Sequence, residues 1–145
     1  MFGIVGAVLV LLAVAAVAGR PPNGEAQTYT TMVQSDTSGM QAPQEAVAAC
    51  LARQPSPVPC RNQLQALDDQ LASFQHDLDR NPAPACLHDS DQELREALRD
   101  MRLSAQTAHQ AGPFDSATVR DATDALDSAT SHLRQAAALR NAASC

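Results

Sequence analysis

The chain has 145 residues and a formal net charge of −6, and arginine supplies all ten of its Lys and Arg positions. A chain of this length holds one small domain. Because its charge balance provides no basic face, the sequence excludes nucleic acid and anionic membrane surfaces from the expected partners.

Residues 2–19, FGIVGAVLVLLAVAAVAG, carry no charge. Such a run is typical of an export signal or of a membrane-spanning anchor. The small residues Ala16 and Ala18 fit a signal peptidase that cuts between Ala18 and Gly19, which favours a signal peptide over residues 1–18. The near-spanning length of the run, with no basic residue before it, favours an uncleaved anchor. In both alternatives this run is the only expected membrane contact.

Residues 19–42 are predicted to form a flexible polar tether. Their sequence, GRPPNGEAQTYTTMVQSDTSGMQA, is rich in Thr, Ser and Gln and shows no obvious apolar period. Too little apolar surface is present to offset the entropy of ordering such a segment. We therefore expect the tether to act as a spacer.

Residues 43–145 are predicted to form an all-α domain. A short helix over 43–53 precedes three long helices over 60–80, 85–111 and 115–143. In each long helix, apolar residues recur at steps of three and four, which is the pattern of a helix packed along a neighbour. These positions are Leu64, Leu67, Leu71, Phe74 and Leu78; Leu87, Leu94, Leu98, Met101, Ala105 and Ala108; and Val119, Ala122, Leu126, Ala129, Leu133 and Ala136.

Prolines separate the predicted long helices. Pro82 and Pro84 end the first of them, and Gly112-Pro113 ends the second. Short connections make consecutive helices antiparallel neighbours, so we expect a small up-down-up helical bundle with the short first helix across one end. Its apolar faces could also pair between copies, which makes self-association a possible partnership.

The four cysteines are predicted to form two disulfides. In the up-down-up arrangement, Cys50 and Cys60 lie together at one end of the bundle, and Cys86 and Cys145 lie together at the other. Either alternative pairing would need bonds along the bundle's length. The loop between Cys50 and Cys60 is wider than the spacing of zinc ligands, and no CxxC motif is present, so a metal or redox site is not expected.

Cys86-Leu87-His88-Asp89 resembles the Cys-x-x-His-Asp element of secreted phospholipases A2. In that family the histidine activates water and an aspartate binds calcium, so the resemblance implies a secreted lipid hydrolase that uses His88 and Asp89. The likeness is confined to these residues and is one position short. With no recognisable calcium loop, we instead interpret Asp89 and Asp91 as helix-start residues, and Asp91 with Arg95 as an exposed ion pair.

The remaining polar candidates are interpreted as solvated. His76, His109 and His132 lie on separate predicted helices, and Asp121, Asp124 and Asp127 recur every third residue, which does not build one helical face. Residues 89–93, DSDQE, lack the glycine of a calcium loop. We therefore expect no cofactor, no metal and no catalytic residues.

The sequence as a whole favours an exported, non-catalytic binding or structural module of a bacterial envelope or secretome, with a protein as the expected partner. Its bacterial origin is inferred from the abundance of Ala and Arg with no Lys, which is the usage of a GC-rich genome. The alternatives are a membrane-anchored extracytoplasmic bundle and a phospholipase-like hydrolase.

Overall fold

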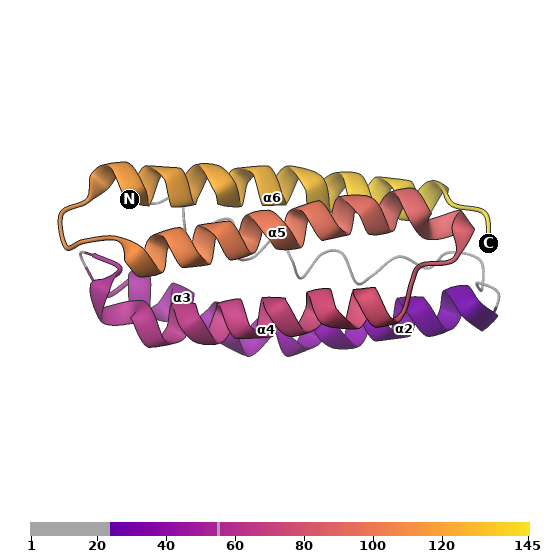
Figure 1. The fold of residues 1–145 in the computed structure, drawn as a ribbon, viewed down its shortest axis with the longest axis horizontal. Helices are drawn as coiled ribbons and strands as arrows, with labels where there is room; N and C mark the ends of the chain where they lie inside the picture. The colour runs from indigo at the N-terminus through magenta and orange to yellow at the C-terminus, as the bar shows by residue number, and fades with distance from the viewer. Residues whose placement is uncertain (1–23, 55) are drawn as a thin grey trace.

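The fold is all-α in a computed structural model that describes residues 24–54 and 56–145 (Figure 1). The predicted signal peptide or anchor over 1–18 and the cleavage site between Ala18 and Gly19 lie outside the described residues. Within the described ranges, no helix has the length and apolar character needed to cross a bilayer.

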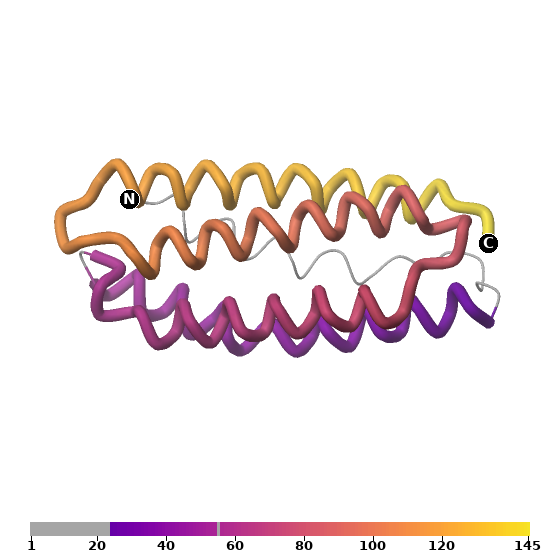
Figure 2. Tube along the Cα trace, in the orientation of Figure 1, coloured from indigo at the N-terminus to yellow at the C-terminus, as the bar shows by residue number. Residues whose placement is uncertain are grey.

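Helices α2 with α3, then α4, α5 and α6 make up four arms. The arms are antiparallel, and their connections alternate between the two ends of the bundle (Figure 2). Helix α2 begins at the end where the chain's C-terminus lies, and α3 continues to the opposite end (Figure 1). The chain then returns through α4, reverses in α5 and returns again in α6. The elements are α2 (Gly24–Gly39), α3 (Gln41–Leu51), the 3-10 turn η2 (Val58–Cys60), α4 (Arg61–Arg80), the 3-10 turn η3 (Ala85–Leu87), α5 (His88–Gln110) and α6 (Ser116–Ala142).

The three predicted long helices are confirmed as α4, α5 and α6. In all three, the apolar residues recur on one face of the helix, which packs against its neighbours. The Asp115 side chain caps the start of α6 by accepting a hydrogen bond from the backbone N–H of Thr118 at 3.0 Å. The cap satisfies one of the N–H groups that a helix start leaves without a partner. The end of α6 at Ala142 lies close to the predicted end at 143.

The prediction of a flexible tether is wrong for residues 24–39, which form α2. Its buried residues, Ala26, Tyr29 and Val33, are followed by the fully buried Met40, and these positions continue the steps of three and four that mark a packed helix. Asp36 occupies the one missing step, and polar residues fill the other faces. The helix is ordered because α4, α5 and α6 supply an apolar surface for these few side chains.

The short first helix also differs from its prediction. It spans Gln41–Leu51, and it runs alongside α4 instead of across the end of the bundle (Figure 1). Met40, between α2 and α3, has a helical backbone with φ −80° and ψ −15°. Helices α2 and α3 therefore form a single arm that is antiparallel to α4.

The core is centred on large side chains from α4 and α5, whereas α6 contributes mostly alanine. Leu71, Phe74 and Leu98 are at most 1% exposed. The buried residues of α6 are Ala122, Ala129, Leu133 and Ala136. These small side chains allow α5 and α6 to approach closely enough for hydroxyl groups of α5 to bond to the α6 backbone. Ser90 Oγ donates to Ala136 O at 2.8 Å, and Ser104 Oγ donates to Ala122 O at 2.6 Å.

The two expected disulfides are present, one at each end of the bundle. Cys50 is joined to Cys60 across a sequence separation of 10, and Cys86 is joined to Cys145 across a separation of 59. The first ties α3 to the start of α4, and the second ties the start of α5 to the end of the chain. Since cytosolic thiols are kept reduced, the two bonds indicate an oxidising environment.

Removing either disulfide should destabilise the bundle, and the bond that closes the longer loop should matter more. We expect Cys86→Ser with Cys145→Ser to lower the free energy of unfolding by about 4 kcal/mol, and Cys50→Ser with Cys60→Ser by about 3 kcal/mol, from the chain entropy of the loops. Urea unfolding followed by circular dichroism measures both. Equal stability of the wild type and either double variant would contradict the assignment of the disulfides as structural bonds.

Candidate functional site

The histidine and aspartate singled out by the sequence lie on the surface of the bundle. His88 and Asp89 are both exposed in the first turn of α5, at one end of the bundle. Among the described residues, no group of three or more His, Cys, Asp or Glu side chains is arranged to hold a metal ion. Neither His88 nor Asp89 lines the groove described below.

His132 differs from its predicted solvated position. Its side chain is half-buried between α5 and α6, where Nδ1 lies 2.6 Å from Glu93 Oε2 and Nε2 lies 3.9 Å from Asp100 Oδ2. The two carboxylates come from α5, and the imidazole comes from α6. Because the two ring nitrogens face opposite carboxylates, the arrangement joins two helices and does not converge on an ion.

The main buried polar cluster connects α2 to α5 through Tyr29, Asp91 and Arg95, which we call the α2 clamp. Tyr29 Oη donates a hydrogen bond of 2.5 Å to Asp91 Oδ1, and Arg95 Nε donates to Asp91 Oδ2 at 2.7 Å. Asp91 is 6% exposed and Tyr29 is 8% exposed. The interpretation of Asp91 and Arg95 as an exposed pair is therefore wrong, because α2 covers the carboxylate.

Arg95 extends the α2 clamp to α4. Its Nη2 donates to the carbonyl oxygen of Leu78 at 2.7 Å, and its Nη1 pairs with Asp79. Burial lowers the pKa of Arg95, but its bonds to Asp91 and Asp79 raise that pKa by more. The guanidinium group consequently stays charged and joins α5 to α4, while Tyr29 of α2 bonds to the other oxygen of the same Asp91. A buried carboxylate with both oxygens engaged in this way is stabilised at its position.

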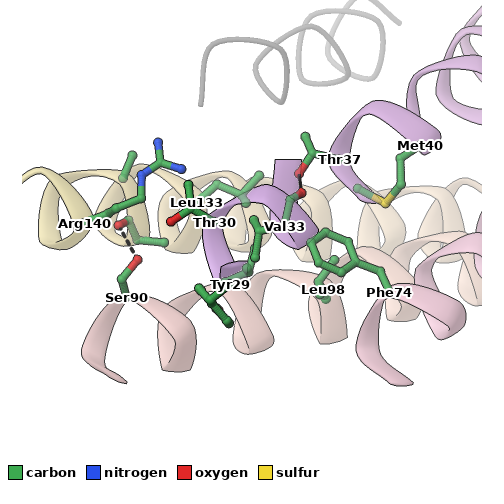
Figure 3. Close-up of a pocket in the computed structure, with 13 residues that line it drawn as sticks. Tyr29, Thr30, Val33, Thr37, Met40, Phe74, Ser90, Leu98, Leu133 and Arg140 are labelled. Atoms are coloured by element: carbon green, nitrogen blue, oxygen red, sulfur yellow. Dashed lines mark hydrogen bonds between the residues drawn. The ribbon is translucent and has the colours of Figure 1, made fainter. Parts of the chain in front are cut away.

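A groove lies between α2 and α6, and side chains of α4 and α5 contribute to its lining (Figure 3). Figure 3 shows Arg140 and Ser90 at one end of it and Met40 and Phe74 at the other. The lining is predominantly apolar, and the cavity has a volume of about 40 Å³. Ligand pockets measure about 300–1,000 Å³, whereas one water occupies about 30 Å³, so this space is too small for an enclosed small molecule.

Arg140 is the charged residue of the groove lining, and burial lowers its pKa, partly opposed by Tyr29. An arginine keeps its charge under these conditions because its ordinary pKa lies above 12. The rest of the α6 side of the groove consists of Leu133, Ala136 and Ala137. The groove therefore presents a long apolar floor with a cation near one end.

Helix α2 also carries a poorly accommodated carboxylate on its α4 side. Asp36 Oδ2 is buried with no hydrogen-bond partner among the described residues. Burial, and then repulsion from Asp77 of α4, raise the pKa of Asp36 above its ordinary value. The clamp and this carboxylate act in opposite directions on α2: one holds it against α5, and the other weakens its contact with α4.

No protein-family model, no curated protein and no solved structure matches this chain. The assignment of a function therefore rests on the residues of the chain itself.

Sequence reasoning missed the α2 clamp because it placed Tyr29 in the tether. The available signal was the only tyrosine of the chain, lying at helical spacing from Ala26 and Val33. Asp91 gave a second signal, since it occupies an inward position of α5 that leucine fills in later turns. A buried acceptor at such a position requires a donor from another element.

The α2 clamp predicts a loss of stability at alkaline pH. Burial, followed by the hydrogen bond to Asp91, raises the pKa of Tyr29 far above its ordinary value of about 10. Above about pH 10, the unfolded chain releases the phenolic proton of Tyr29, while the folded chain retains it. The free energy of unfolding should then fall by about 1.4 kcal/mol per pH unit. Urea unfolding at pH 9 to 11 measures this slope, and the chain has no lysine and no other tyrosine to obscure it.

The matched variant is Tyr29→Phe, which keeps the ring and removes the hydroxyl. It should lose about 1–3 kcal/mol at pH 7, because Asp91 keeps only one of its two buried partners. It should also lack the alkaline slope. Ultraviolet absorbance of the wild type provides a second measurement, since tyrosinate should appear only as the protein unfolds. Ionisation of Tyr29 near pH 10 in the folded protein would contradict the clamp.

Asp36→Asn should stabilise the bundle at pH 7 by about 1 kcal/mol, because it removes a charge from a buried oxygen that has no partner. The folded state binds the Asp36 proton more tightly than the unfolded state does. The wild-type penalty is therefore absent at pH values below about 4, the ordinary Asp pKa, and it appears as the pH rises through the raised pKa. Chemical unfolding at pH 3 and pH 7 tests this. Asp121→Asn, on an exposed position of α6, is the control and should change stability by less than about 0.5 kcal/mol.

Proposed function

We propose that the protein is an exported, non-catalytic helical bundle that acts by binding, as a structural or adaptor module of a bacterial envelope or secretome. The observation that carries this proposal is the pair of disulfides, which close both ends of a bundle whose α6 core positions are mostly alanine. Proteins with this construction depend on an oxidising compartment.

The free energy that the disulfides contribute to folding supports export over residence in a reducing compartment. The two disulfides together contribute about 7 kcal/mol by the chain-entropy estimate, while small domains have a total stability of about 5–15 kcal/mol. A bundle in which one of the longest helices supplies mainly alanine has little apolar area to replace that contribution. Reduction would therefore leave the fold marginal, which links the function of the protein to a space outside the cytoplasm.

The disposition of the titratable groups supports binding over catalysis. Asp91, Arg95 and His132 are buried or half-buried, and each uses its polar contacts to join helices. His88 and Asp89 are exposed and do not line the groove between α2 and α6. A hydrolase needs its acid and base to converge on one point beside the substrate.

The compartment is tested by intact mass in the host of origin, recovered separately from membranes and from the medium. We expect a species that begins at Gly19 and gains four hydrogens on reduction. An Ala18→Arg variant should block processing and leave the full-length chain on membranes. Full-length wild type confined to membranes with both disulfides formed would favour the anchored alternative. Free thiols in a cytoplasmic protein would refute the proposal.

The non-catalytic part is tested on phospholipid vesicles supplied with calcium. We expect neither the wild type nor His88→Ala to release fatty acid above the rate without protein. Hydrolysis by the wild type that the variant lacks would instead assign the protein to lipid hydrolases.

A further inference from the structure

The two disulfides differ in how well a reagent in solution can reach them. Cys145 is exposed, and it is the last residue of the chain. Its partner, Cys86, is half-buried in η3 and packs against the core. In the other disulfide, Cys60 is 0% exposed and Cys50 is half-buried on α3. An exposed cysteine therefore occurs in only one of the two bonds.

The end of the chain can move without opening the bundle. Helix α6 ends at Ala142, and Ala143 packs on the core while its N–H donates a hydrogen bond of 3.3 Å to Arg140 O. Ser144 and Cys145 follow as exposed residues outside the helix, and the C-terminus lies beside the start of α5 (Figure 1). Breaking the disulfide therefore releases the last two residues, while α6 keeps its packing.

We propose that Cys86–Cys145 is a site of thiol–disulfide exchange, at which an external thiolate attacks Cys145 Sγ. The incoming sulfur forms a mixed disulfide with Cys145, the bond between the two protein sulfurs breaks, and its electron pair leaves on Cys86 as a thiolate. Cys86 can then attack the mixed disulfide and restore the original bond. Alternatively, a second external thiolate attacks the incoming sulfur, which releases Cys145 as a thiolate and oxidises the two external thiols to a disulfide.

Burial and the fold favour Cys145 as the attacked sulfur and Cys86 as the leaving group. Exchange depends on which sulfur an external thiolate can reach, and Cys86 packs on the core. Cys86 also precedes α5, whose N-cap residue, Leu87, provides no side-chain hydrogen bond. Backbone N–H groups at such a helix start favour negative charge, which helps Cys86 to leave as a thiolate. The carboxylate of Asp89 opposes this effect, but it is exposed and therefore screened.

Access and stabilisation act in opposite directions on the two bonds. The Cys86–Cys145 bond closes a loop of 59 positions and the Cys50–Cys60 bond a loop of 10, so chain entropy makes the first the more stabilising bond. That difference affects the equilibrium between folded and unfolded protein. The rate of exchange in the folded protein depends on access instead. The more stabilising disulfide should therefore be the one that reacts first.

The test is a time course of the folded, oxidised protein in dithiothreitol, with samples acidified, alkylated and digested by trypsin. Because the chain has no lysine, trypsin places the four cysteines on four separate peptides, which end at Arg53, Arg61, Arg95 and Cys145. Mass spectrometry then follows each disulfide by the pair of peptides that it links. We expect the initial rate of loss to be at least about tenfold higher for Cys86–Cys145 than for Cys50–Cys60.

The matched control is the same protein unfolded in urea, where all four cysteines are accessible and the two rates should agree within about threefold. Equal rates in the folded protein, or faster loss of Cys50–Cys60, would overturn the proposal. A rate for Cys86–Cys145 that does not rise with thiol concentration would also overturn it, because exchange would then wait for unfolding. Circular dichroism should retain its helical signal during the fast phase, and a simultaneous loss of helix would contradict exchange in the folded state.

The attacked sulfur is identified with glutathione as the thiol and rapid acid quenching. We expect the mixed disulfide mainly on the peptide 141–145, which carries Cys145, and a majority on the peptide 81–95, which carries Cys86, would overturn the assignment.

A reduced thioredoxin-type protein that lacks its second cysteine provides the protein-thiol probe. Adducts on Cys145 with both probes would support exchange with thiols of either size, and an adduct with glutathione alone would support exchange with small thiols. Absence of any adduct on Cys145 would refute the proposal. These measurements use the purified protein, so their outcome is independent of the compartment and partner in the proposed function.

Discussion

Helix α6 turns mostly alanine toward the core, and this shortage of apolar volume is the constraint on which the rest of the structure depends. Alanine permits α5 and α6 to approach until Ser90 and Ser104 reach the α6 backbone, but it buries little area. The bundle compensates at its two ends, where disulfides restrict the unfolded chain. The disulfides therefore compensate for the apolar area that the alanines of α6 do not bury.

Attachment of α2 follows a different principle. Few apolar residues of α2 are buried, and its α4 side carries the poorly accommodated Asp36. The α2 clamp therefore does much to fix the position of α2 on the bundle. Tyr29 reaches a carboxylate that Arg95 already orients, and each partner satisfies a group that would be costly to bury alone. Such attachment is directional, because the hydrogen bond to Asp91 fixes where Tyr29, and with it α2, lies along α5.

Much of the fold was predictable from the sequence, since leucine spacing and proline positions are local signals. The limits of α4, α5 and α6 follow from them closely, and the resulting topology brings the cysteines of each pair to one end. The α2 clamp and the groove were not predictable in the same way. Tyr29 and Asp91 are separated by 62 positions, and the spacing of each residue within its own helix does not show which partner it meets.

The sequence by itself determined the all-α class, three of the four arms, the disulfide-stabilised domain and the apolar segment that precedes it. Each depends on periodicity or composition within a short window. Only the tertiary structure decided that residues 24–39 are a helix, that Asp91 is buried, and that a small groove lies between α2 and α6. These features arise where one element covers another, because a helix with few apolar residues is ordered by the surface it meets and not by its own propensity.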